Sequence, residues 1–135
     1  MEISVEWDNQ EQSLMRWTFP THWTWQDYDT AQRTANGMLK TVPHKVGIIG
    51  DMRATVLLPR NAIAVYHSTL AKLPANRGRI VLVGPSGFVR EMVAIFRKLY
   101  PRKSYDFLFV FANTLEEARE ILLPIYSQTI SWDLT

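Results

Sequence analysis

The sequence contains no cysteine among its 135 residues. This absence excludes thiol catalysis, a Cys-x-x-Cys redox pair, a disulfide framework and the common structural zinc sites. The three histidines, His22, His44 and His67, fall in separate segments without the spacing of metal ligands. We therefore expect neither a metal site nor a cofactor.

Long hydrophobic runs are also missing. The longest, such as residues 107–112, are far shorter than the roughly 20 residues that span a bilayer. No basic segment followed by an apolar one opens the sequence, as it would in a signal peptide. We expect a soluble, cytoplasmic chain without membrane insertion.

The sequence has little net charge, a formal +2, but acidic groups prevail in residues 1–51 and basic groups in residues 52–135. A basic surface can attract nucleic acid or an acidic partner. Here Arg97 and Lys98 fit the C-terminal end of a predicted helix, where they complement its dipole. The other basic residues fit a solvated surface, and nucleic-acid binding is not expected. The basic surplus is densest at Arg90, Arg97, Lys98, Arg102 and Lys103.

The sequence is rich in hydrophobic and aromatic residues. Hydrophobic residues make up 47% of it, and four of the five tryptophans fall in the first 25 residues. A chain of this length buries one core, and no repeat, low-complexity segment or linker divides it. We expect a single domain over residues 1–135, with a short tail at 127–135. Trp23 and Trp25 have no basic neighbours and are expected to pack rather than stack on bases.

Hydrophobic periodicity predicts five strands. Strict alternation over residues 2–7 and 13–19 indicates an antiparallel hairpin with one covered face. Three apolar runs, at residues 46–49, 80–83 and 107–111, are typical of parallel strands buried on both faces.

Helical spacing of apolar residues predicts four helices. The first follows Thr24, which with Asp27 forms a carboxylate variant of the capping box, and the last follows Thr114 in a full Thr-x-x-Glu box. The other two cover residues 59–73 and 86–99. The order β-β-α-β-α-β-α-β-α predicts an α/β fold in which a mixed five-stranded sheet, an N-terminal antiparallel hairpin followed by parallel strands, carries four helices.

The C-terminal ends of parallel strands share one rim, where ligand sites of open sheets lie. Asp51 directly follows a buried strand, and we interpret it as a turn residue that accepts backbone N–H bonds. The turn at residues 84–87 could point N–H groups at an anion, but it has neither the Walker nor the GxGxxG pattern. This rim is expected to carry residues 51–55, 84–87 and 113–114.

Three apolar residues, Val56, Leu57 and Leu58, fall in the loop before the second predicted helix. They either fold beneath that helix or form an exposed patch. We expect them to be buried.

Four segments of the sequence carry a resemblance to a known family. They are Trp23-Thr24-Trp25-Gln26-Asp27-Tyr28, Ile48-Ile49-Gly50-Asp51-Met52-Arg53, Ile80-Val81-Leu82-Val83-Gly84 and Val110-Phe111-Ala112-Asn113-Thr114-Leu115-Glu116-Glu117-Ala118. With the opening hairpin, they make residues 2–125 resemble the SpoIIAA-like group of STAS domains (sulfate transporter and anti-sigma-factor antagonist).

The resemblance implies a non-enzymatic regulatory or protein-interaction module. In anti-sigma antagonists a Ser or Thr just after the Asp that ends the third strand is phosphorylated by a partner kinase. Asp51 matches that Asp, but Met52 and Arg53 follow it and carry no hydroxyl. Thr55 is the nearest candidate phosphoacceptor and is displaced, so the resemblance implies a module without the Ser/Thr phospho-switch. The charge of Arg53 suggests a rim that contacts an anion or an acidic partner.

Three hypotheses of function follow. The first is a module without catalysis that binds a protein partner or a second copy of itself. The second is a binder of a small apolar or acidic ligand between the hairpin and the helices, with Arg53 or Arg90 on an acidic head group. The third is an enzyme built on Asp51 and His67, whose predicted geometry is poor, and no enzyme is expected. The first uses Asp51, Arg53, Thr55, Leu57, Gly84, Ser86 and Arg90; the second is lined by Trp17, Trp23, Trp25, Phe88 and Met92.

Overall fold

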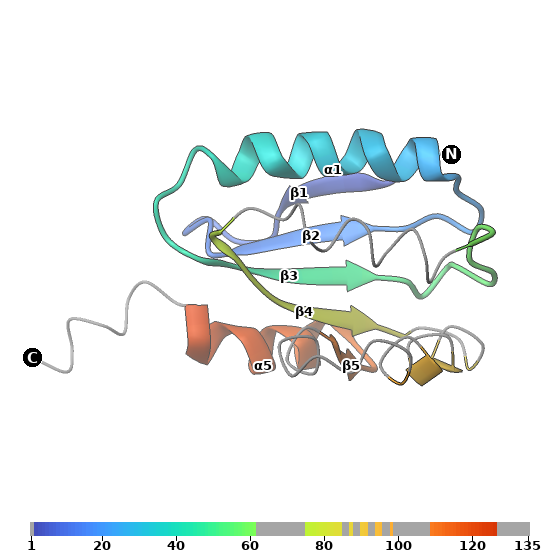
Figure 1. The fold of residues 1–135 in the computed structure, drawn as a ribbon. Coiled ribbons are helices and arrows are strands. Elements are labelled where there is room, and N and C mark those ends of the chain that lie inside the picture. The colour runs from blue at the N-terminus through green and yellow to red at the C-terminus, as the bar shows by residue number, and fades with distance from the viewer. Residues whose placement is uncertain are drawn as a thin grey trace, which may run out of the picture.

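A computed structural model describes residues 2–61, 75–84, 87, 90–91, 94–95, 98 and 109–126. Within these residues, five strands form one mixed sheet in the order β1-β2-β3-β4-β5, and two helices accompany it (Figure 1). The α/β class and the mixed five-stranded sheet that the sequence predicts are confirmed. The elements are β1 Ser4–Trp7, β2 Leu14–Thr18, α1 Trp25–Leu39, β3 Val46–Asp51, β4 Arg77–Val83, β5 Phe109–Ala112 and α5 Leu115–Tyr126.

The first two strands form the predicted antiparallel hairpin, in which Glu6 lies opposite Arg16 and Trp7 opposite Met15. Asn9 shapes the turn, because its side-chain oxygen accepts the backbone N–H groups of Ser13 and Leu14 at 3.1 and 3.2 Å. Side chains alternate along both strands. Met15 and Trp17 face the cluster beneath α1, whereas Leu14 points to the other face and is buried beneath α5.

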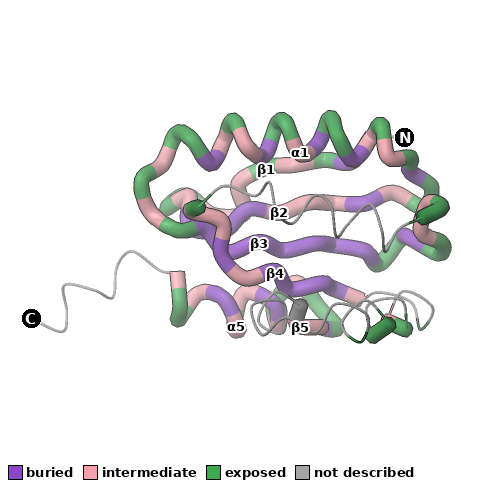
Figure 2. Tube along the Cα trace, in the orientation of Figure 1, coloured by how far each residue is buried: buried purple, intermediate pink, exposed green. Residues whose placement is uncertain are grey.

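The remaining strands all run parallel to β2. Every residue of β3 is buried, as expected for the central strand of a sheet with covers on both faces. Ile48 faces the cluster beneath α1, and its neighbour Ile49 faces the cluster beneath α5. Figure 2 shows this central burial between two helices whose outer sides are exposed. The predicted two-sided burial of this strand is confirmed.

Helix α1 begins where the capping pattern predicts. The Thr24 hydroxyl accepts the Asp27 backbone N–H at 3.1 Å, and the Asp27 carboxylate accepts the Thr24 N–H at 2.9 Å. Its buried side chains, Tyr28, Ala31, Ala35 and Leu39, recur at helical spacing and face the sheet.

Helix α5 packs on the opposite face, against β3, β4 and β5. The Thr114 hydroxyl accepts the Glu117 backbone N–H at 3.0 Å, as predicted. The Glu117 carboxylate reaches back to the N–H of Asn113 at 3.2 Å instead of that of Thr114. At the other end of the helix, the Tyr126 hydroxyl accepts the Arg79 backbone N–H at 2.7 Å, which fastens the last turn to β4.

The predicted fold with four helices is wrong for the described residues, which hold two helices, α1 and α5. A helix beginning at Pro59 is excluded because Asn61 has φ 61°, a left-handed conformation that a right-handed helix does not accept. The rest of the predicted helix at 59–73 and most of the one at 86–99 lie outside the described residues. So do His67, Ser86, Phe88, Met92 and the tail at 127–135.

The ring of Tyr126 packs closely against two glycines, Gly47 on β3 and Gly78 on β4, which together form a glycine floor. A methyl group on Gly78 would come within 2.5 Å of the Tyr126 ring, whereas one on Gly37, on the exposed side of α1, would meet nothing within 4 Å. We predict that Gly78→Ala lowers the free energy of unfolding by about 1–3 kcal/mol through overpacking. Gly37→Ala should raise it by up to about 1 kcal/mol through helix propensity.

Urea denaturation of the two variants checks this prediction. Equal and small effects of the two substitutions would contradict the close approach of Tyr126 to β4.

Candidate functional site

The carboxyl ends of β2, β3, β4 and β5 lie side by side, as the sequence predicts. Thr18, Asp51 and Val83 are neighbours in register, and Val83 pairs with Ala112. Backbone bonds continue past the strand ends, from Met52 N–H to the Val83 carbonyl at 3.0 Å and from Gly84 N–H to the Ala112 carbonyl at 2.8 Å. The rim is therefore a fixed edge of the sheet, and it positions the side chains that follow the strand ends.

Asp51 and Arg53 form a bidentate ion pair on this rim. Arg53 Nε and Nη2 donate to the two carboxylate oxygens at 2.9 and 2.8 Å, and the Arg53 backbone N–H donates to Oδ1 at 3.2 Å. The Asp51 side chain is 9% exposed and that of Arg53 is 53% exposed. The hydrogen bonds from Arg53 hold the pKa of Asp51 below its usual value, against the opposing effect of burial.

This pairing changes the chemistry expected of the rim. Asp51 accepts a backbone N–H bond as expected, but it is the last residue of β3 and not a turn residue, and its carboxylate also neutralises Arg53. Arg53 is therefore not a free cation that could bind an acidic head group. Its guanidinium keeps N–H groups on the exposed side, so it can still donate to a partner while bound to Asp51.

Gly84 provides the surface on which Arg53 lies. It has φ +60°, and a Cβ built on it would fall 2.5 Å from Arg53 Cγ. A residue with a side chain would therefore be strained at this position and would displace the arginine stem.

Thr55, the candidate phosphoacceptor, is 2% exposed, and its hydroxyl donates to the Pro20 carbonyl at 2.7 Å. In this position the hydroxyl serves as an anchor that ties the loop after β3 to the segment before α1. Phosphate could be attached only after that hydrogen bond breaks and the loop opens.

The expected burial of Val56 and Leu57 is wrong, because their exposed fractions are 52% and 59%. Leu58 is half-buried and packs on the cluster beneath α1. The backbone carbonyl of Arg60 accepts the indole N–H of Trp25 at 2.7 Å. The loop is thus held at Thr55, Leu58 and Arg60 while two apolar side chains face outward. We call residues 51–58 the rim loop.

Arg90 has its guanidinium carbon 4.7 Å from the centroid of the Phe111 ring on β5. This is cation–π geometry. The described contacts thus bring together Asp51, Arg53 and Gly84, whereas Arg90 is placed on an aromatic ring.

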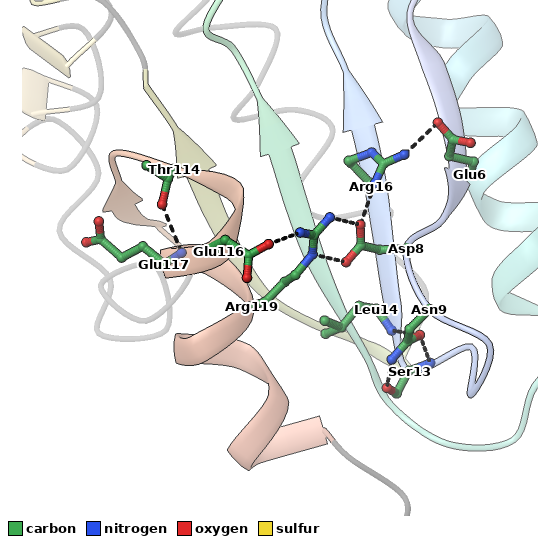
Figure 3. Close-up of polar contacts among 10 residues, drawn as sticks. All are labelled: Glu6, Asp8, Asn9, Ser13, Leu14, Arg16, Thr114, Glu116, Glu117 and Arg119. Carbon is green, nitrogen blue, oxygen red and sulfur yellow. Dashed lines mark hydrogen bonds and ion pairs between the residues drawn. The ribbon is translucent and has the colours of Figure 1, made fainter.

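A second polar site, which the sequence analysis missed, links the hairpin to α5 (Figure 3). Asp8, whose side chain is 1% exposed, accepts from Arg16 on β2 and from both Nε and Nη2 of Arg119 on α5, at 2.8 and 2.9 Å. Glu6 and Glu116 pair with the outer sides of the two arginines. The hydrogen bond from Arg119 is the main cause that holds the pKa of Asp8 below its usual value.

This network is a structural tie, since both oxygens of Asp8 are engaged by the chain's own arginines. The cross-strand pair of Glu6 and Arg16 follows from the hairpin register and could have been predicted from it. Arg119 lies 111 residues from Asp8, and no local pattern signals that contact.

Metal chemistry finds no support in the described residues, where no group of three or more His, Asp or Glu side chains is placed to hold an ion. None of the helices described is long and apolar enough to cross a membrane. Compared with known proteins, the chain matches no protein-family model and no curated protein.

The Asp8 network predicts a pH-dependent stability. A carboxylate with a lowered folded pKa stabilises the fold above its unfolded pKa, about 3.9, and loses that effect as the pH falls through the folded value. Asp8→Asn should therefore lower the free energy of unfolding by about 2 kcal/mol at neutral pH. The difference from the parent should shrink in acid, as measured by urea denaturation across pH.

Glu116→Gln is the matched control, because it removes an 80% exposed carboxylate from the same Arg119. It should change stability by less than about 0.5 kcal/mol. An Asp8→Asn deficit that stays constant into acid would show that the charge of Asp8 is not the cause.

The contact of Gly84 with Arg53 makes another prediction. Gly84→Ala should lower the free energy of unfolding by about 1–2 kcal/mol, part from the positive φ and part from the displaced arginine. In an Arg53→Ala background the second part disappears, so the loss should be smaller. A double-mutant cycle by thermal or urea unfolding checks this, and strict additivity would contradict it.

Proposed function

We propose that this chain is a non-enzymatic, cytoplasmic regulatory or protein-interaction module that resembles STAS/SpoIIAA-like domains and binds through its rim loop. The partner is a protein, with a second copy of the chain as the simplest case. The observation that carries the proposal is the outward display of Val56 and Leu57 beside Arg53, on a loop that is itself held to the core.

Preorganisation supports this choice of surface. Exposed apolar side chains on a mobile loop lose conformational freedom when they bind, which reduces affinity. Here Thr55 is hydrogen-bonded to the Pro20 carbonyl and Leu58 is packed on the core. The two residues between them are displayed by a loop that is anchored on both sides, so little further ordering is needed.

The chemistry of the rim also supports binding in place of catalysis or a phospho-switch. Asp51 is occupied by Arg53, so it is a poor general base. The residues directly after Asp51 have no hydroxyl, and the Thr55 hydroxyl is buried. The rim presents to solvent an apolar surface next to a guanidinium. Burial of apolar surface favours association, and arginine is enriched at protein interfaces.

Leu57→Asp tests the proposal, with Ile125→Asp as the matched control, because Ile125 is a comparably exposed apolar residue (49%) on α5. Light scattering across protein concentration measures self-association, and cross-linking in the native cell with quantitative mass spectrometry measures other partners. We expect Leu57→Asp to lose an association that the parent and Ile125→Asp keep. If no association distinguishes the two variants, the rim loop is not the binding surface.

A further inference from the structure

Five aromatic side chains gather between the end of β2 and the start of α1. Ring centroids lie 5.2 Å apart for Phe19 and Trp23, 5.4 Å for Trp23 and Trp25, and 5.5 Å for Trp17 and Tyr28. Several of these pairs are tilted or edge-to-face, the arrangements that aromatic rings prefer. We call Trp17, Phe19, Trp23, Trp25 and Tyr28 the aromatic cluster.

The three tryptophans of this cluster differ in the hydrogen bonding of their indole N–H groups. The Trp25 indole N–H donates to the Arg60 carbonyl. The indole nitrogens of Trp17 and Trp23 are buried, and in the described structure neither has a hydrogen-bond partner. The whole Trp23 residue is only 9% exposed.

Two unused donors in one cluster call for an explanation. An indole N–H buried without an acceptor costs free energy on the order of 1–3 kcal/mol, and such groups are rare in native proteins. An indole nitrogen can only donate, so the missing group is a hydrogen-bond acceptor. Each of the five rings in the cluster also offers an apolar or aromatic contact to whatever carries that acceptor.

We propose that the aromatic cluster binds a small, neutral, largely apolar or aromatic molecule whose carbonyl-type oxygen accepts from Trp17 and Trp23. The neutral class follows from the charges. No member of the cluster is charged, and Arg53 is paired with Asp51. A carboxylate buried among these five uncharged side chains would be costly. The ligand must separate rings that contact one another in this structure, so only small molecules are expected to bind.

The aromatic cluster adjoins the rim loop, whose Leu58 packs on the same apolar cluster beneath α1, but its side chains are different from the exposed Val56 and Leu57. A ligand could bind between the rings with no protein partner present, and the loss of Leu57-dependent association would leave the inference intact. The two proposals therefore fail independently.

The test uses the full chain with its tryptophan indoles labelled with ¹⁵N, observed by NMR. The probes are acetophenone, its isostere ethylbenzene, which lacks the oxygen, and the carboxylate benzoate. We expect acetophenone to move the indole proton signals of Trp17 and Trp23 downfield in a saturable way. Ethylbenzene should produce no downfield shift, and benzoate should bind more weakly than acetophenone.

Variants identify the donors. Trp23→Phe keeps an aromatic ring and removes one N–H, so it should weaken acetophenone binding roughly five- to tenfold and change ethylbenzene binding little. Trp7→Phe makes the same exchange on β1, outside the cluster, and should leave both affinities unchanged. If Trp23→Phe does not fold, Trp17→Phe and the titration of the parent chain decide.

Three results would overturn the proposal. The first is an absence of shifts at Trp17 and Trp23 with acetophenone, which would leave an internal water as the acceptor. The second is an equal loss of acetophenone affinity in Trp23→Phe and Trp7→Phe. The third is tighter binding of benzoate than of acetophenone, which would replace the neutral class by an acid.

Discussion

A strand with both faces buried needs a cover on each side, and β3 imposes that constraint on the rest of the chain. Its alternate side chains, Ile48 and Ile49, feed two separate apolar clusters. Helix α1 covers the first and helix α5 the second. Burial of this kind is non-directional and scales with area, so it brings the layers together without fixing their position. Directional contacts at the edges do that.

Two of these contacts hold α5. Tyr126 lies on the glycine floor of β3 and β4 and accepts from the Arg79 N–H, and Arg119 binds Asp8 on the hairpin. The helix therefore meets the sheet through a tight aromatic contact at its last turn and an ion pair nearer its start. The rim is held in a similar way, since the pair of Asp51 and Arg53 is seated on Gly84. Val56 and Leu57 are exposed on the loop that follows this pair.

Local signals in the sequence were sufficient for the hairpin, for the start of α1 at its capping box and for the two-sided burial of β3. Each rests on residues within one or two turns or pleats of one another. The Asp51–Arg53 pair also had a local signal, an Asp-x-Arg spacing at a strand end, although the sequence suggested that Arg53 contacts an anion or an acidic partner. The predicted helix at Pro59 failed because periodicity does not register the left-handed Asn61. The exposure of Leu57 and the contact of Asp8 with Arg119 depend on tertiary packing, for which neighbouring residues give no signal.

The tie between Asp8 and Arg119 also bears on how the chain is made. The two residues are 111 positions apart, so the contact closes a loop that includes most of the sheet. During synthesis the hairpin leaves the ribosome before α5 does, so Asp8 then lacks its helix partner and Leu14 lacks the cover that α5 provides. Contacts this distant in sequence slow folding, because their loop must close before they stabilise anything. The hairpin thus emerges before α5 but is completed only when α5 docks, and over that interval its uncovered face is what a chaperone would meet.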